Sequence, residues 1–147
     1  MSDSQPHPFT PKPGRPRRGA VGVIWHADRL LVIRRARTVT APGMMCFPGG
    51  GIEAGETEEK ALIRELSEEL AAVVVPVRRI LSSRTPWGME LAWWLAELAD
   101  PTSLRANPQE VESFHWYTPA EMAALPKLLE SNRDFLERAA RGEIAIH

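Results

Sequence analysis

Apolar residues recur with two different periods along the chain, and these periods divide it into predicted strands and helices. Four short apolar runs that are rich in β-branched or aromatic residues predict strands at residues 20–25, 30–34, 73–82 and 90–98. The run at 90–98 is apolar at consecutive positions, which is typical of a strand covered on both faces in the middle of a sheet. A further strand is predicted at residues 111–117.

The period changes to that of a helix between residues 57 and 70. Leu62, Leu66 and Leu70 recur there every four residues, so they form one apolar stripe that is expected to face a core. Thr57 is placed to cap the start of this helix.

Two more helices are predicted near the C-terminus. Thr118 is followed by a proline and, three positions later, by Glu121, a pattern typical of a capping box at the start of a helix. The last helix is predicted at residues 131–141, with Gly142 placed to end it. Residues 36–46 show no clear period and are predicted to be a loop. The elements together predict a mixed sheet with helices packed on it, a layered α/β sandwich.

The first 18 residues differ from the rest of the chain. They contain five prolines, which oppose regular helix or sheet pairing, and several basic residues. We expect residues 1–18 to form a disordered, Pro-rich basic tail whose role stays open. Residues 19–147 are expected to form a single domain, which suits a chain of 147 residues.

Composition narrows the class of protein. Hydrophobic residues make up 44% and charged residues 25%, as in ordinary globular domains. A formal net charge of −1 gives no strong case for nucleic acid or for an anionic membrane surface. No apolar stretch is long enough to span a bilayer, and no signal-type segment opens the chain, so a cytoplasmic location is expected. A single cysteine, Cys46, excludes an internal disulfide and is expected to be a small buried hydrophobe.

Three glutamates give the helix at 57–70 a second feature. Glu65, Glu68 and Glu69 are spaced i, i+3, i+4, so they project from one side of the helix beside the leucine stripe. A cation would offset their mutual repulsion, and three carboxylates with several waters suit Mg²⁺. Taken alone, the helix also fits a solvated acidic face. The flanking residues decide between the two.

Gly50 is followed after five residues by Glu56, and after seven more by Arg64-Glu65-Leu66-Ser67-Glu68-Glu69-Leu70-Ala71-Ala72. This segment resembles the Nudix box, Gly-x5-Glu-x7-Arg-Glu-apolar-x-Glu-Glu-x-Gly-apolar. Ala71 stands where the pattern has glycine, which suggests a changed exit from the helix rather than lost metal binding. The resemblance implies the Nudix fold, an α/β/α sandwich with a mixed β-sheet and a loop–helix–loop motif, over residues 19–147.

The resemblance also implies an activity. Members of the family are Mg²⁺-dependent hydrolases, with Mn²⁺ as an expected substitute, in which water attacks phosphorus and cleaves a pyrophosphate bond. The expected substrate is a small nucleoside diphosphate linked to another moiety: a nucleotide, a sugar nucleotide or a dinucleotide. Many members are dimers, so a homodimer is compatible with the resemblance.

Site residues are carried over from the motif by position. Glu65, Glu68, Glu69 and the carbonyl of Gly50 are the expected metal ligands. Glu65, Arg64 and Glu68 are the expected catalytic group, with Arg64 holding Glu65, and the identity of the general base stays open. Glu56 is expected to support the loop or to bind a further ion.

Further site residues are expected outside the motif. Many members use one more carboxylate, and Glu110 is the first candidate, with Glu112 as the alternative. Arg34 and Arg35 end the second predicted strand and are expected to bind substrate phosphates, unless they form an ordinary polar strand end. Most of the five tryptophans are expected in the core.

Two other functions fit parts of the sequence. One is a catalytically silent Nudix-like module that binds a ligand or a partner, although the intact Arg64, Glu65, Glu68 and Glu69 argue against it. The other is an isopentenyl diphosphate isomerase, which shares the fold but requires a cysteine, for which Cys46 is the only candidate.

Overall fold

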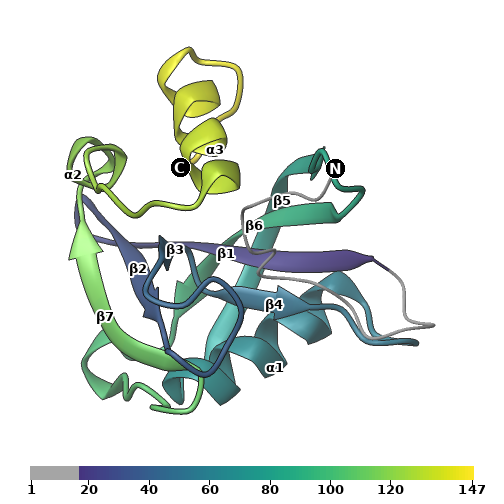
Figure 1. The fold of residues 1–147 in the computed structure, drawn as a ribbon, viewed down its shortest axis with the longest axis vertical. Coiled ribbons are helices and arrows are strands. Elements are labelled where there is room, and N and C mark those ends of the chain that lie inside the picture. Colours follow the sequence, from purple (N-terminus) through teal and green to yellow (C-terminus); the bar gives the residue numbers. More distant parts are fainter. Residues whose placement is uncertain (1–16) are drawn as a thin grey trace.

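The computed structural model describes residues 17–147, which form a seven-stranded mixed sheet with helices on both faces (Figure 1). The strands are β1 (Arg18–His26), β2 (Arg29–Arg35), β3 (Met45–Cys46), β4 (Gly49–Gly51), β5 (Val74–Arg84), β6 (Glu90–Leu98) and β7 (Val111–Tyr117). The helices are α1 (Glu58–Leu70), α2 (Pro119–Ala123) and α3 (Glu130–Ala140), with a 3-10 turn, η1 (Pro101–Ser103). The tail was predicted for residues 1–18, of which residues 1–16 lie outside the described part of the chain. Arg18, the last residue of the predicted tail, is the first residue of β1.

The strand order is β3-β2-β1-β6-β5, with β4 pairing to β1 and β7 pairing to β2. The pair β1–β6 is parallel and the other pairs are antiparallel. Strand β6 lies between β1 and β5, which confirms the central position that its apolar sequence predicted. In residues 17–147 we find no helix with the length and apolar character needed to cross a membrane.

The sheet separates the hydrophobic core into two layers. Alternate residues of β1 serve both layers, because Ala20 and Ile24 face the α1 side and Val21 and Val23 face the α3 side. On the α1 side, Leu62, Leu66 and Leu70 are fully buried, as the periodicity predicted. On the α3 side, Trp93 stacks on Phe135 with ring centroids 4.5 Å apart. Figure 1 shows α1 and α3 on opposite faces of the sheet, so the α/β/α sandwich is confirmed.

Strand β3 lies in the segment predicted as loop, which is wrong there, and β4 was not predicted. They contain two and three residues, too few to produce a period of two. Their partners create them: β3 pairs to β2, and β4 pairs to the start of β1 through Gly19, Ala20 and Val21. The capping box at Thr118 is present as predicted, with Glu121 bonded to the backbone of the cap.

The end of α1 keeps the geometry that a glycine would give. Ala71 has φ 52° and ψ 30°, the left-handed conformation, and its N–H donates to the carbonyl of Ser67 (3.0 Å). The bond from Ala71 to Ser67 is the 5→1 bond of an αL helix end, and the N–H of Ala72 donates further back, to the carbonyl of Leu66 (3.2 Å). The changed exit that the sequence suggested is therefore wrong, because the alanine adopts the left-handed conformation despite a cost of about 1–2 kcal/mol.

Replacing this alanine should stabilise the protein. We expect Ala71→Gly to raise the free energy of unfolding by ~1 kcal/mol, because glycine adopts positive φ without steric cost and this outweighs its greater freedom in the unfolded chain. Urea denaturation measures the change. Ala72→Gly is the matched control: Ala72 is buried and has no positive φ, so this substitution should destabilise. Equal effects of the two substitutions would contradict the left-handed end.

Candidate metal and active site

Arg64 is the centre of a hydrogen-bond network that joins α1 to the loop before it. Its Nε and Nη2 donate to the two oxygens of Glu56 at 2.7 and 2.9 Å, and Nη2 also donates to the carbonyl of Gly51 at 2.9 Å. Its Nη1 donates to Glu65 Oε1 (2.8 Å) and to Glu68 Oε1 (3.2 Å). The bidentate pairing with Glu56 raises the pKa of Arg64 further, against the opposing effect of burial, so the guanidinium stays charged and orients Glu65 and Glu68.

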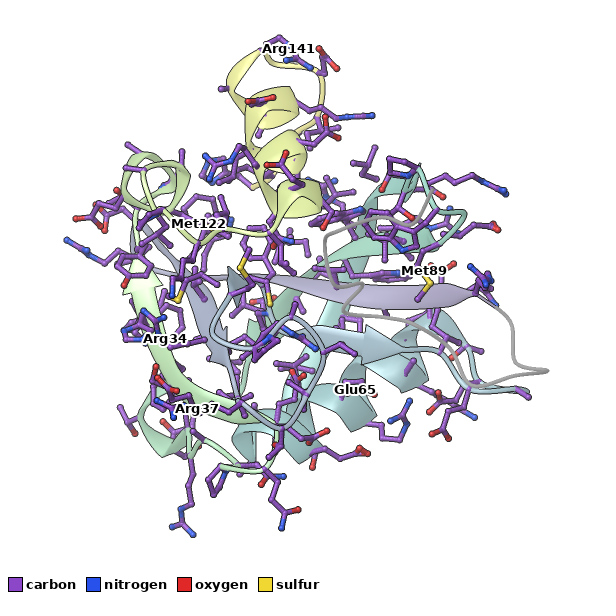
Figure 2. All side chains as sticks on the ribbon, in the orientation of Figure 1. Arg34, Arg37, Glu65, Met89, Met122 and Arg141 are labelled. Carbon is purple, nitrogen blue, oxygen red and sulfur yellow. The ribbon has the colours of Figure 1, made fainter. Side chains whose placement is uncertain are left out.

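Glu65 lies directly against the glycine strand β4. Figure 2 shows its side chain between α1 and that strand. A Cβ atom at Gly50 would come within 2.3 Å of the Glu65 carboxyl carbon, so a side chain at position 50 would displace the carboxyl group. The side chain is 13% exposed, and burial raises the pKa of Glu65 to about 7, although the hydrogen bond and charge of Arg64 act in the opposite direction.

Glu69 is held one turn further along the same helix. It is 6% exposed, and its Oε1 accepts a hydrogen bond from the Gly49 N–H at 3.1 Å. Burial raises the pKa of Glu69 well above its usual value, and the neighbouring Glu65 adds to the effect. Gly49 has φ 153°, and a Cβ atom there would come 2.2 Å from the Ala20 carbonyl oxygen of β1. Glycine at this position therefore lets β4 pack closely between β1 and α1.

The two candidate carboxylates outside the motif have different surroundings. Glu110 lies near the acidic residues of α1, since the Asn107 side-chain amide is 3.4 Å from Glu110 Oε2 and donates to the Glu68 carbonyl at 3.1 Å. Burial raises the pKa of Glu110, and the charge of Glu68 raises it further. Glu110 in turn contributes to the raised pKa values of Glu65 and Glu69. Glu112 instead points to the surface, half exposed, with its Oε2 3.7 Å from Nε of Arg34. The structure thus brings Glu110, and not Glu112, to the cluster.

The two arginines at the end of β2 also have different surroundings. Arg35 is 7% exposed, its Nε donates to the Thr40 carbonyl at 2.7 Å, and its charge lowers the pKa values of Glu69 and Glu110. Arg34 donates to the Gly43 carbonyl at 3.0 Å, near the outer edge of the sheet (Figure 2). Only Arg35 therefore faces the candidate site, and it does so as a buried charge.

Asn107 belongs to the site region, although the sequence analysis did not identify it as a site residue. Its Nδ2 donates to the Glu68 carbonyl (3.1 Å) and lies 3.4 Å from Glu110 Oε2. The N–H groups of Asn107 and Arg105 donate to the carbonyls of Glu69 and Leu70, which would otherwise lack partners at the end of α1. The Asn-Pro pair three residues before Glu110 was the available signal of a turn.

Cys46 and the tryptophans take other places. Cys46 is buried in the hydrophobic core, as expected, and burial raises its pKa to about 11. Its enclosure, at 2% exposed, argues against the isomerase alternative. The expectation that most tryptophans lie in the core is wrong: Trp93 is buried, whereas Trp25, Trp87, Trp94 and Trp116 are partly buried and pack against the core. Trp87 also lines a cleft of about 460 Å³ between the β5–β6 turn and α3, together with Ser83 and Ser131.

The acidic residues do not form a closed cage. Within residues 17–147, no group of three or more His, Cys, Asp or Glu side chains is already arranged around one point as metal ligands. Glu65 and Glu68 face Arg64, and Glu69 faces an amide of β4. A cation at this site would therefore replace part of the present hydrogen bonding.

Residues 15–139 match the NUDIX domain family. The chain belongs to this family. The NAD-capped RNA hydrolase NUDT12 of Pongo abelii is 35% identical over 95 residues, which are 65% of this chain and 21% of that protein. The 8-oxo-dGTP diphosphatase of Escherichia coli is 44% identical over 52 residues, 35% of this chain and 40% of that protein. The chain thus spans well under half the length of these two relatives.

The same family appears among solved structures. A NUDIX hydrolase from Nitrosomonas europaea superposes with a TM-score of 0.70 at 19% identity, covering 90% of this chain and 76% of that one. At this identity the likeness concerns the fold. The loop, α1 and the turn after it are therefore a NUDIX motif in a NUDIX fold.

The buried acids of the NUDIX motif should make stability depend on pH. Because Glu65 has a pKa of about 7 when folded and an ordinary value near 4.5 when unfolded, the folded protein binds more protons between these values. We expect the free energy of unfolding of the metal-free protein to fall as pH rises from 4.5 to about 7, with Glu69 acting in the same direction. Urea denaturation with a chelator present measures the slope.

Glu65→Gln should flatten this slope, because an amide does not titrate. Glu112→Gln is the control, since its half-exposed carboxylate should leave the slope as it is. A metal-free protein that becomes more stable across this range would contradict the burial of the two acids.

Proposed function

We propose that this chain is a Mg²⁺-dependent pyrophosphohydrolase, with Mn²⁺ as a substitute, that cleaves a diphosphate bond in a nucleoside diphosphate derivative. The proposal is carried by one observation: Glu65 and Glu69 are buried side by side against Gly50 and Gly49, with Arg64 fixing the outer face of the cluster. The names of the relatives, an NAD-capped RNA hydrolase and an 8-oxo-dGTP diphosphatase, agree with this class of reaction.

The residues present fit a hard divalent cation. Glu65, Glu68, Glu69, Glu110 and the carbonyl of Gly50 would supply only oxygen donors, which Mg²⁺ prefers. Two carboxylates buried together lose solvation and repel each other, and a cation offsets both costs. The ion would neutralise charge on the diphosphate oxygens and lower the pKa of the attacking water.

The chain's own groups then have distinct tasks. Glu65 has the fixed orientation of a general base, and with a carboxylate oxygen that does not bind the cation it would take the proton of the water that attacks phosphorus. Arg64 keeps that carboxylate and Glu68 in place, while the Gly49 N–H fixes Glu69. Arg35, buried near Glu69 and Glu110, would reduce the negative charge that a phosphate meets on entering. Positioning and electrostatics supply most of the acceleration in reactions of this type.

A substrate panel tests the proposed activity. We expect Mg²⁺-dependent turnover of at least one member of a panel of nucleoside triphosphates, sugar nucleotides, dinucleotide polyphosphates, NAD and NAD-capped RNA, with ¹⁸O from water appearing in a phosphate product. Glu65→Gln should lower kcat by ~10²–10⁴-fold, the usual contribution of a general base. Glu59→Gln, an exposed acid on the same helix, is the control and should keep full activity.

Binding without hydrolysis would support the alternative function, a ligand-binding module. If the protein binds Mn²⁺ and nucleotides but hydrolyses no member of the panel, the chain is a ligand-binding module with a NUDIX fold and the proposed activity is wrong.

A matched pair of variants tests the carboxylate outside the motif. Glu110→Gln should raise the Mg²⁺ concentration for half-maximal activity by ~10-fold, because this residue faces the cluster. Glu112→Gln removes the same charge two residues away, on the side chain that pairs with Arg34, and should leave the metal dependence unchanged. Kinetics against Mg²⁺ concentration distinguish them. The reverse order of effects would place Glu112 at the metal.

A further inference from the structure

The first residue of α1 is bonded to side chains from three different strands. Glu58 Oε1 accepts hydrogen bonds from Trp94 Nε1 of β6 (2.8 Å) and from Arg79 Nε of β5 (3.1 Å). Glu58 Oε2 lies 3.4 Å from Arg18 Nη2 of β1. The Glu58 side chain is 16% exposed, so its carboxylate is largely enclosed by the residues that it contacts. None of these contacts belongs to the metal site.

Two of the three donors, Arg79 and Trp94, lie in one row of the sheet, whereas Arg18 is opposite Glu90, four positions along β1 from Gly22. In the strand register, Arg79 is opposite Trp94, and Trp94 is opposite Gly22 of β1. A Cβ atom at Gly22 would come 3.2 Å from Leu62 Cδ1, so the helix approaches the sheet closely one turn after Glu58. The first two turns of α1 therefore contact this row through the Glu58 hydrogen bonds to Trp94 and Arg79 and through the tight apolar contact at Leu62, and Arg18 adds a contact nearer the start of β1.

The contacts of Glu58 and Leu62 with the sheet lie on the helical face that carries the candidate metal ligands. Glu58, Leu62, Glu65 and Glu69 follow one another at i, i+4, i+7 and i+11, which places them within roughly 60° around the helix. Glu58 and Glu69 are separated by ~17 Å along the axis of one continuous helix. Because a helix is stiff over this length, a roll or a slide at Glu58 moves Glu65 and Glu69 with it.

Hydrogen bonds and apolar packing contribute differently here. The buried leucines hold α1 on the sheet, but apolar contacts are not directional. Partly exposed ion pairs contribute little to global stability, and Arg79 is half exposed. Donors fixed on three strands do, however, define one position for the carboxylate. A displacement of 1 Å at a reacting group can cost ~10²-fold in rate, so position matters more than stability at this site.

We propose that Glu58 is a positioning residue: its contacts with Trp94, Arg79 and Arg18 set the roll and height of α1, and so hold Glu65 and Glu69 against Gly50 and Gly49. For its consequence in catalysis, this inference rests on the proposed function of the Glu65–Glu69 site.

The first measurement needs neither metal nor substrate. The Gly49 N–H donates to Glu69, so its ¹H–¹⁵N resonance reports the position of the far end of the helix face. We expect Glu58→Gln and Trp94→Phe, which alter opposite sides of the same hydrogen bond, to shift this resonance in the metal-free protein and in the same direction. Glu59→Gln removes an equal charge from an exposed position in the same turn and should leave it unchanged.

The second measurement is metal affinity. Glu58→Gln and Trp94→Phe should each weaken Mn²⁺ binding, measured by calorimetry, by ~10-fold, as is usual for residues that orient metal ligands. The double variant should weaken binding by less than the two single effects combined, because both variants act on the Glu58–Trp94 hydrogen bond while Glu58→Gln also alters the contacts with Arg79 and Arg18. The kcat of each variant should fall, whereas Glu59→Gln keeps the wild-type values.

A purely structural role gives another pattern. If the variants lower the melting temperature but keep the Gly49 resonance and the Mn²⁺ affinity of the wild type, Glu58 only stabilises the fold and the inference is wrong. If the wild type binds Mn²⁺ but hydrolyses no substrate, the proposed function fails while the Gly49 and Mn²⁺ measurements still test Glu58. Trp94→Phe keeps an aromatic ring in place, so it provides the test even if Glu58→Gln folds poorly.

Discussion

Two carboxyl groups buried side by side against a strand of glycines are the constraint on which the rest of this structure depends. Glu65 and Glu69 lose solvation there and repel each other, which raises the pKa of both. Their position requires glycine at 49 and 50, because any side chain would strike the β1 backbone or the Glu65 carboxyl. An arrangement this costly persists where a function uses it, and a cation is the partner that reduces its cost.

Both faces of the sheet contribute to holding the glycine strand. On the α1 side, Glu69 accepts a hydrogen bond from the Gly49 N–H. On the α3 side, the Phe47 N–H donates to Oδ1 of the buried Asn132, at 2.8 Å. The Phe47 ring meets Phe135 edge-on, with centroids 5.5 Å apart. Phe47 and Gly49, two residues apart, are thus held from opposite layers of the structure. Helix α3 therefore supports the site although it carries none of the candidate metal ligands.

Local patterns predicted what depends on local spacing. The leucine stripe of α1, the central position of β6 and the capping box at Thr118 each follow from residues a few positions apart, and the structure confirms them. Strands β3 and β4 were missed because they exist only through pairing with β2 and β1. Strand alternation could not decide between Glu110 and Glu112, because Glu110 lies in the turn before β7 and Glu112 lies within the strand. Their different surroundings, like those of Arg34 and Arg35, depend on tertiary contacts. The predicted change at the end of α1 was wrong because glycine favours the left-handed conformation but is not required for it, and Ala71 adopts it.

The most direct measurement of the central claim is anomalous diffraction from crystals soaked in Mn²⁺. The account predicts a manganese peak within bonding distance of carboxylate oxygens of Glu65 and Glu69, with Glu68 or Glu110 turned toward it and the contact between Glu65 and Arg64 loosened. A well-ordered crystal with no peak at these residues, or with manganese bound only elsewhere on the chain, would contradict it.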